Sequence, residues 1–265
     1  MSKYYGIFKM QFKGELQYRA KALSGIATQF FWGLMYIYLY TAFMSSSSVD
    51  GFTLSQMASY IWLGQSFFAL RYMGMPKHAS DEIVNGNVCY KFIRPINIYN
   101  QWYFEYLGEK LAATLLRFFP IIVISVLLPT NYGLSMAVSG SAFILFLISL
   151  FIGGMLCVSI SMFSVYLTFV TQSPKGSAAV ISTIAGLLGG SLIPIPLMPS
   201  SIQYALNFLP FRYISDLPFR IYIGNIGIND ALIQIGISIL WLAITILLGQ
   251  LLIRKSLKKT VIQGG

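Results

Sequence analysis

The sequence predicts an all-α membrane protein with six transmembrane helices, an N-terminal interfacial helix and a broken, re-entrant-like hairpin before the last span. The 265 residues are 56% hydrophobic and only 10% charged, whereas soluble domains carry about 25% charged residues. Apolar stretches long enough to cross a bilayer alternate with short polar segments. Because no long polar region separates them, we expect residues 1–265 to form a single transmembrane domain.

Residues 2–21 are expected to form an amphipathic helix that lies on the membrane surface. Tyr5, Phe8, Phe12 and Leu16 recur at spacings of three or four residues, so they share one helical face. Lysines occupy a neighbouring face, and this arrangement suits the headgroup boundary of an anionic leaflet. A basic flank that only sets the topology is the alternative interpretation.

Six apolar stretches are predicted to span the membrane. They cover residues 22–44, 54–75, 106–128, 138–170, 177–195 and 231–253. The second contains Arg71 close to its far end, where a long side chain can snorkel to the interface. The third carries Arg117 near its middle. The fourth is longer than a bilayer requires, so we expect it to tilt, to extend beyond the bilayer or to bend at Gly153-Gly154.

Residues 197–229 are only partly apolar and are predicted to form a re-entrant or surface hairpin on the extracytoplasmic side. Two short helical pieces, separated by Pro210 and Pro218, fit this stretch because proline interrupts helices. Arg212, Asp216 and Arg220 recur every four residues, which allows ion pairs on one helical face. We expect these three charges to serve the structure rather than to bind substrate.

A polar island, residues Lys77–Lys110, interrupts the apolar chain and holds half of its acidic residues. With six spans, fifteen of the eighteen Lys and Arg residues lie on the side that carries the island and both termini. Only Arg212 and Arg220 lie on the other side. Because cytoplasmic segments carry an excess of Lys and Arg, we expect the island and both termini to be cytoplasmic.

The residue types argue against several functional classes. One histidine, two distant cysteines and the absence of a P-loop motif leave no expected metal site, His-based catalytic relay or ATP site. The basic residues flank apolar spans rather than forming a soluble basic face, which argues against nucleic-acid binding. No acidic residue lies clearly at mid-depth in a span, which argues against a proton- or sodium-driven carrier.

Two local patterns and the order of the predicted elements together indicate a family resemblance. The first is Glu82-Ile83, then Gly86, then the run Phe92–Pro95; the second is LPFRYISDLPFRIYIGN, Leu209–Asn225. With the basic start and six spans, they make the whole chain resemble the membrane (permease) subunit of a type-2 ATP-binding-cassette (ABC-2) exporter. The second pattern is similar to the subgroup of paired bacterial permeases often labelled multidrug-type.

The resemblance implies a half-transporter that works with a second permease, identical or a related different chain, as in a heterodimer. It implies separate ABC ATPase subunits that bind ATP and Mg²⁺ and dock on the first cytoplasmic loop, here residues 76–105. It also implies a bacterial cytoplasmic membrane and an exported cargo that is amphipathic, drug-like, lipid-like or peptide. The chain itself would be a non-catalytic transport subunit without a cofactor. A carrier or channel independent of ATP remains the alternative.

The expected ATPase-coupling element is a short helix in the island. Ser80 is its candidate N-cap, Asp81 and Glu82 would favour the helix dipole in its first turn, and Gly86 can end it. Pro95 then redirects the chain toward the third span. The full set of candidate coupling residues is Ser80, Asp81, Glu82, Ile83, Val84, Gly86, Arg94 and Pro95.

The contact surface between the two permeases, which we call the seam, is expected to involve the first, second and fifth spans by resemblance to the family. Gly186, Gly189 and Gly190 of the fifth span would allow close helix packing there. Arg117 is costly in mid-membrane, so it should face protein or water. It would line either the export pathway or the seam, or else snorkel and bond to helix carbonyls.

Overall fold

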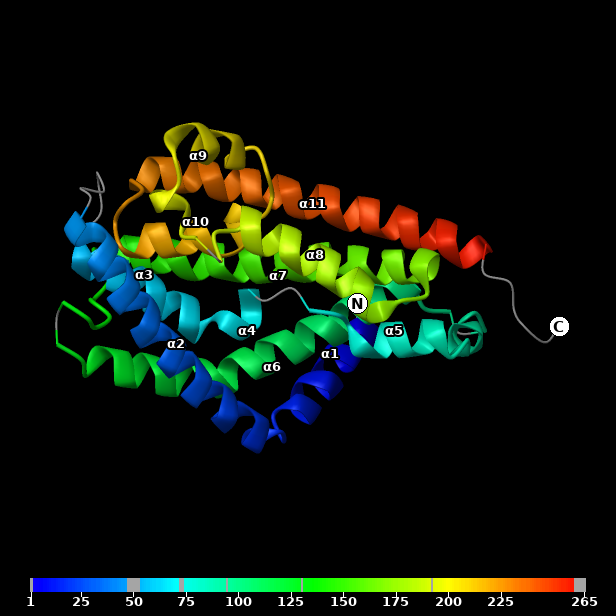
Figure 1. Cartoon of the computed structure of the whole chain (residues 1–265). Coiled ribbons are helices and arrows are strands. Elements are labelled where there is room, and N and C mark those ends of the chain that lie inside the picture. The colour runs from blue at the N-terminus through cyan, green and yellow to red at the C-terminus, as the bar shows by residue number, and fades with distance from the viewer. Residues whose placement is uncertain are drawn as a thin grey trace.

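The computed structural model describes residues 2–46, 53–71, 74–93, 95–129, 131–191 and 193–259, and these residues are folded into helices and their connections. The longest helices lie alongside one another (Figure 1). The α-helices are α1 Ser2–Glu15, α2 Arg19–Ser46, α3 Leu54–Ser66, α4 Phe68–Arg71, α5 Lys77–Val84, α6 Ile98–Val126, α7 Gly140–Thr171, α8 Pro174–Leu188, α9 Ser200–Leu206, α10 Arg212–Tyr222 and α11 Ile228–Lys259. Two 3-10 helices are η1 Asn87–Lys91 and η2 Ile195–Leu197.

Three helices are long and apolar enough to cross a membrane, over Ala22–Phe43, Gly140–Thr171 and Ile228–Lys258 of the described residues. These ranges correspond to the first, fourth and sixth predicted spans. The remaining predicted spans fall on shorter or more polar helices. At 1.5 Å per residue, the 15-residue α8 covers about 22 Å, less than the ~30 Å of hydrocarbon.

The second predicted span is not one continuous helix, which corrects the expectation for residues 54–75. Helix α3 ends at Ser66, and α4 begins at Phe68 after a residue outside helical geometry. The side chain of Arg71 explains part of this break, because its Nε donates a hydrogen bond to the Gly64 carbonyl at 3.0 Å. In an uninterrupted helix that carbonyl would accept from the backbone N–H four residues later.

Helix α7 forms the centre of the molecule, where it packs against α8, α10 and α11. The helix continues through Gly153 and Gly154, so the bend considered from the sequence does not occur there. The two glycines instead allow close packing. A Cβ on Gly153 would lie 2.6 Å from the Ile214 carbonyl oxygen of α10, and one on Gly154 would lie 2.6 Å from Leu70 Cδ1.

The stretch 197–229 contains α9 and α10, between the end of η2 and the start of α11, and α10 is buried along nearly its whole length against α7. Pro210 precedes α10, as expected. Pro218, however, lies inside α10 rather than between two helices. Having no N–H, it leaves the Ile214 carbonyl without its usual helical donor, and this is the carbonyl that faces Gly153.

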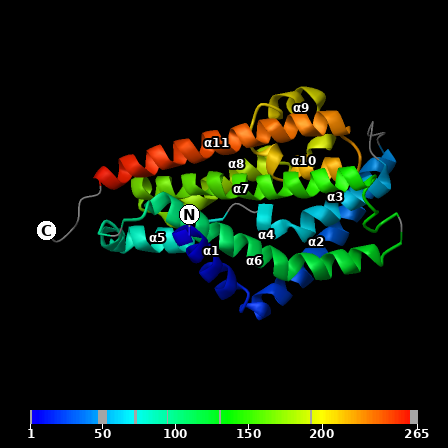
Figure 2. The same cartoon turned by 180° about the vertical axis from the view of Figure 1, so that it is seen from behind.

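The N-terminal helix ends earlier than predicted and packs on protein. Helix α1 stops at Glu15, and α2 starts at Arg19, so residues 2–21 are not one helix. Helix α1 lies against the first part of α6, where Gly108 leaves room for the α1 backbone: a Cβ there would lie 2.8 Å from the Phe8 carbonyl oxygen. Figures 1 and 2 show α1 meeting α2 at a sharp angle beside α6.

The two ends of the molecule differ in what they carry. Both views place α5, the α7–α8 turn and the C-terminal end of α11 at one end. The α6–α7 and α10–α11 connections lie at the other end. The predicted topology requires this separation, since it assigns the first three segments to one side and the last two to the other.

Candidate functional site

The short helix of the polar island begins four residues before the predicted position, because its N-cap is Pro76 and not Ser80. Helix α5 starts at Lys77 after Pro76, and the Ser80 hydroxyl donates to the Lys77 carbonyl at 2.8 Å instead of capping the helix. No acidic residue lies in its first turn, so the expected dipole stabilisation by Asp81 and Glu82 is wrong. The helix ends at Val84, just before Gly86, whose φ of 72° is readily adopted by glycine.

The loop part of the polar island is shorter than expected. Helix α6 begins at Ile98, so the end of the predicted loop 76–105 is already helical and the third span does not begin at residue 106. Lys110 is buried inside this helix, where its Nζ donates to the Ala69 carbonyl at 3.1 Å. The side chain therefore holds α6 against α4 and is not part of a solvated flank.

Two of the predicted coupling residues point into the protein. Glu82 forms an ion pair with Lys91 at 2.7 Å and accepts a hydrogen bond from Trp102 Nε1 of α6, also at 2.7 Å. Ile83 is buried in an apolar cluster with Val88 and Trp102. These contacts fasten α5 and η1 to α6, which sequence periodicity did not reveal because Trp102 lies twenty residues from Glu82.

The outer surface of the island is apolar at its far turn. We call this surface the apolar tip; its members are Val84, Tyr90, Phe92 and Ile93. Ile93 is 85% exposed and Tyr90 is 68% exposed. Of the other predicted coupling residues, Asp81 and Pro95 are exposed, and the Pro95 carbonyl accepts from Lys3 Nζ at 3.2 Å. Arg94 lies outside the described residues.

A second candidate site is a cavity of about 580 Å³ between α2, α4, α8 and α10. Gly186 and Gly189 line it, and Gly190 lines a smaller adjoining cavity of about 30 Å³. The structure therefore brings the predicted seam glycines together with residues of α2. Arg117 does not line either cavity; it packs against α2, where a Cβ on Gly25 would lie 2.9 Å from its Cζ.

The cation in the cavity wall is Arg71, which sequence reasoning had treated only as a snorkelling residue. Its Nε bonds to the Gly64 carbonyl, and one terminal nitrogen donates to the Ser191 hydroxyl at 2.9 Å. The guanidinium also lies 5.6 Å from the centre of the Phe68 ring. The signal available in the sequence was a lone arginine in an apolar stretch, since such residues are usually functional.

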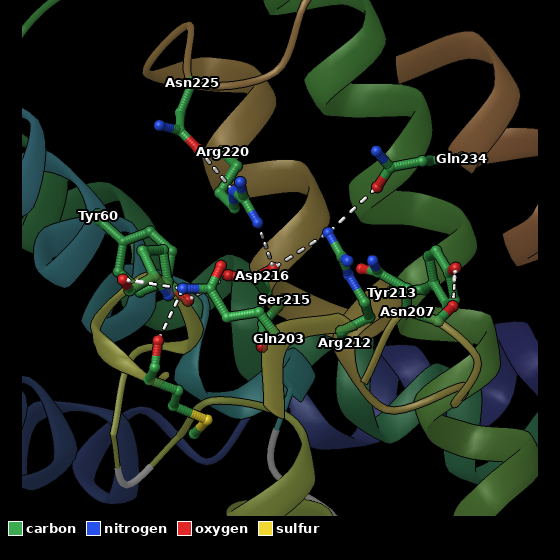
Figure 3. Close-up of polar contacts among 12 residues, drawn as sticks. Tyr60, Gln203, Asn207, Arg212, Tyr213, Ser215, Asp216, Arg220, Asn225 and Gln234 are labelled. Carbon is green, nitrogen blue, oxygen red and sulfur yellow. Dashed lines mark hydrogen bonds and ion pairs between the residues drawn. The ribbon is translucent and has the colours of Figure 1, made fainter. Parts of the chain in front are cut away.

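The predicted charge cluster of the hairpin is present (Figure 3), with Arg212 and Asp216 buried and Arg220 partly exposed. Asp216 Oδ2 lies 3.6 Å from Arg212 and 3.7 Å from Arg220, and both pairs have the predicted four-residue spacing. Tyr60 of α3 donates to Asp216 Oδ1 at 3.0 Å. The arginines also reach other elements, because Arg212 donates to Gln234 Oε1 at 3.2 Å and Arg220 donates to Asn225 Oδ1 at 2.7 Å. The cluster ties α10 to α3 and α11.

Among the described residues, no three His, Cys, Asp or Glu side chains come together in a way that could hold a metal ion. Neither the apolar tip nor the cavity contains a nucleophile paired with a base.

Residues 30–264 match the family model described as ABC-2 family transporter protein. No curated protein and no solved structure matches the chain. The family match covers most of the chain, in line with the resemblance seen in the island and the hairpin. The chain therefore belongs to the ABC-2 family of transporter membrane proteins, which are non-catalytic and work with a separate ATPase.

Proposed function

We propose that the chain is the permease subunit of an ATP-driven exporter in a bacterial cytoplasmic membrane, with six transmembrane segments and cytoplasmic termini. The segments would be α2, α3 with α4, α6, α7, α8 and α11. The three that are short or polar would complete the crossing with their neighbours, because non-helical backbone is tolerated at depth where protein covers it.

The distribution of basic residues supports this orientation. The end that carries α5 also carries the segments with Lys77, Lys175, Arg254 and Lys255, and all four side chains are exposed. At the opposite end, Arg212 and Arg220 both form ion pairs with Asp216. An excess of Lys and Arg marks the cytoplasmic side.

The observation that carries the proposal is the apolar tip on an otherwise polar turn. Lys77, His78, Asp81, Asn85 and Asn87 are exposed around it, and such side chains do not lie in hydrocarbon. Exposed apolar surface with a polar rim is typical of a protein–protein interaction site. We assign the tip to the groove of the partner ATPase.

The contacts of α5 explain how movement of the ATPase would reach the membrane. Glu82 and Lys91 attach the island to Trp102 of α6, through the hydrogen bond to Glu82 and the Lys91 ammonium 5.4 Å from the Trp102 ring centre. Lys110 then joins α6 to α4. A displacement of the tip would therefore be passed to α6 and on to α4, which borders the cavity.

The cavity would form this subunit's half of the export pathway, completed by a second permease, identical or a different related chain. Helix α2, the α3–α4 segment and α8 correspond to the spans expected at the seam, and all three supply residues to the cavity. An amphipathic, drug-like, lipid-like or peptide cargo fits its mixed lining of aromatic and polar side chains.

The direct test is Ile93→Asp in the reconstituted transporter. Because a charge in an apolar contact disrupts docking, we expect loss of ATPase co-purification and of permease-stimulated ATP hydrolysis. The matched control is Met136→Asp, since Met136 is 84% exposed and lies in the α6–α7 connection at the opposite end. If both variants reduced docking equally, or if neither reduced it, the apolar tip would not be the docking surface. Glu82→Arg is a poorer test because Glu82 also holds the fold.

A further inference from the structure

The large cavity has a strongly asymmetric charge. Arg71 is the one charged side chain among the described residues that line it. The two hydrogen bonds of its guanidinium go to neutral acceptors, the Gly64 carbonyl and the Ser191 hydroxyl. Within the described ranges, no ion pair links Arg71 to a carboxylate. A guanidinium in a membrane domain is costly without an anionic partner, so the site lacks one half of a pair.

The buried carboxylate of Asp216 is already engaged with other residues. Tyr60, which lines the smaller adjoining cavity with Arg71, donates its hydroxyl to Asp216. Asp216 itself is paired with both Arg212 and Arg220 of its own helix. Asp216 therefore balances the two arginines of α10 and does not pair with Arg71. The positive charge of Arg71 faces the cavity.

Two buried glutamine side chains add hydrogen-bonding groups to the wall of the cavity. Gln29 of α2 is 7% exposed and Gln65 of α3 is 5% exposed, and both line the cavity. Neither side chain makes a hydrogen bond with another described residue. Since buried polar groups are normally bonded, each amide has donors and an acceptor available to an occupant of the cavity.

The rest of the wall is suited to an apolar body. Trp32 of α2, Phe68 of α4 and Phe211 before α10 contribute aromatic surface. The volume of about 580 Å³ falls in the range of roughly 300–1,000 Å³ usual for pockets that hold drug-sized ligands. The cavity thus combines one cationic, hydrogen-bonding pole with an aromatic wall.

We propose that the cavity binds an amphiphile with a single anionic head, a carboxylate, phosphate or sulfate, held by Arg71 with help from Gln29 and Gln65. The planar guanidinium can form two parallel hydrogen bonds with such a head, while the apolar body lies along Trp32 and Phe68. This inference rests on the proposed function, because it names the class of cargo for the same cavity. It narrows that class from amphiphiles in general to anionic ones.

The test uses the transporter with its ATPase in nanodiscs of phosphatidylcholine. The probe is 12-bromododecanoate, whose bromine quenches tryptophan fluorescence, and its methyl ester is the uncharged match. We expect the acid to bind at least about tenfold more tightly than the ester, with quenching that is lost in Trp32→Phe. Equal affinity of acid and ester in the unaltered protein would overturn the proposal.

The variants locate the preference at Arg71. Arg71→Gln should weaken binding of the acid by about 10-fold to 100-fold, as for a lost charge-assisted hydrogen bond, and should leave the ester within about twofold. Arg254→Gln, the same change at an exposed position of α11, should alter neither. If Arg71→Gln impairs folding, Gln65→Glu keeps Arg71 and adds an opposing charge, and it should still abolish the preference for the acid. Retention of the preference in both cavity variants would contradict the assignment.

Competition identifies the source of the anion. Nanodiscs that contain phosphatidylglycerol should displace the probe if the natural occupant is a membrane lipid. Displacement by a soluble amphiphilic acid alone would mark a diffusible cargo, and either result supports the anionic class. The outcome is separable from the coupling test: if Ile93→Asp abolishes ATPase docking but acid and ester bind equally, only the cargo inference fails. If docking is unaffected while Arg71 still selects the acid, the coupling proposal fails instead.

Discussion

At the scale of single residues, the buried charges of this domain act through their neighbours. Asp216 is fully buried, and its carboxylate balances two arginines while accepting a hydrogen bond from Tyr60. The ion pairs lie at 3.6 and 3.7 Å, at the long end of the range, so no one of them dominates. The carboxylate instead is the point at which Tyr60 of α3 and both arginines of α10 meet.

Removing that charge is predicted to destabilise the domain more than any surface change. Asp216→Asn keeps the shape of the side chain but removes the charge that balances two guanidinium groups, of which Arg212 is buried and Arg220 is partly exposed. Breaking a buried pair in this way costs roughly 3–5 kcal/mol. Thermal unfolding of the detergent-solubilised protein should show a markedly lower Tm.

The control for that experiment is Asp230→Asn. Asp230 is exposed in the first turn of α11, where a carboxylate contributes only about 0.3–1 kcal/mol through the helix dipole. If both variants unfolded at the same temperature, Asp216 would not be the centre of the hairpin's attachment.

At the scale of elements, α10 is held in the domain by close approach to α7. Pro218 interrupts its backbone hydrogen bonds, and the Ile214 carbonyl, which therefore lacks its helical donor, meets Gly153. A short helix of eleven residues cannot be stable in isolation. Its stability therefore comes from packing against α7, where Gly153 lacks the Cβ that would block the close approach of α10.

Gly153→Ala should test this contact. The added Cβ would lie 2.6 Å from the Ile214 carbonyl oxygen and 2.8 Å from that of Tyr213, so α10 must shift. Overpacking of this kind costs about 1–3 kcal/mol, which outweighs the gain of up to about 1 kcal/mol in helix propensity. Thermal unfolding should show lower stability.

Gly236→Ala in α11 provides the matched change. A Cβ at Gly236 meets nothing within 4 Å in this chain, so propensity alone should act and stability should stay equal or rise slightly. Equal losses in the two variants would show that the effect comes from the glycines' flexibility and not from the α7–α10 contact.

The same elements show what the sequence could and could not predict. Uncharged apolar runs predicted α2, α7 and α11 well, because length and hydropathy decide whether a helix can span. The break between α3 and α4 was missed since it depends on where the Arg71 side chain reaches. The island was recognised as polar, but the inward positions of Glu82 and Ile83 depend on Trp102, a tertiary contact that no local pattern contains.

At the scale of the whole molecule, the two ends of the chain carry different elements. The island, fastened to α6 through Trp102, lies at the end with α5 and the α11 terminus. The buried charge cluster ties α10 to α3 and α11 in the hairpin region. Between them, Lys110 and α4 connect the island to the border of the cavity. We propose that the ATPase acts on the apolar tip and that the attached hairpin stays fixed relative to α3 and α11.

The most direct test places the photo-crosslinking residue p-benzoylphenylalanine at Tyr90 in the purified complex of this chain with its P-loop ATPase. The control is the same replacement at Tyr204 of α9, since the two tyrosines are 68% and 66% exposed. The account predicts a covalent adduct between the chain and the ATPase from position 90 and none from position 204. An ATPase adduct from position 204, or none from position 90 in an active complex, would contradict the assignment of the apolar tip as the coupling surface.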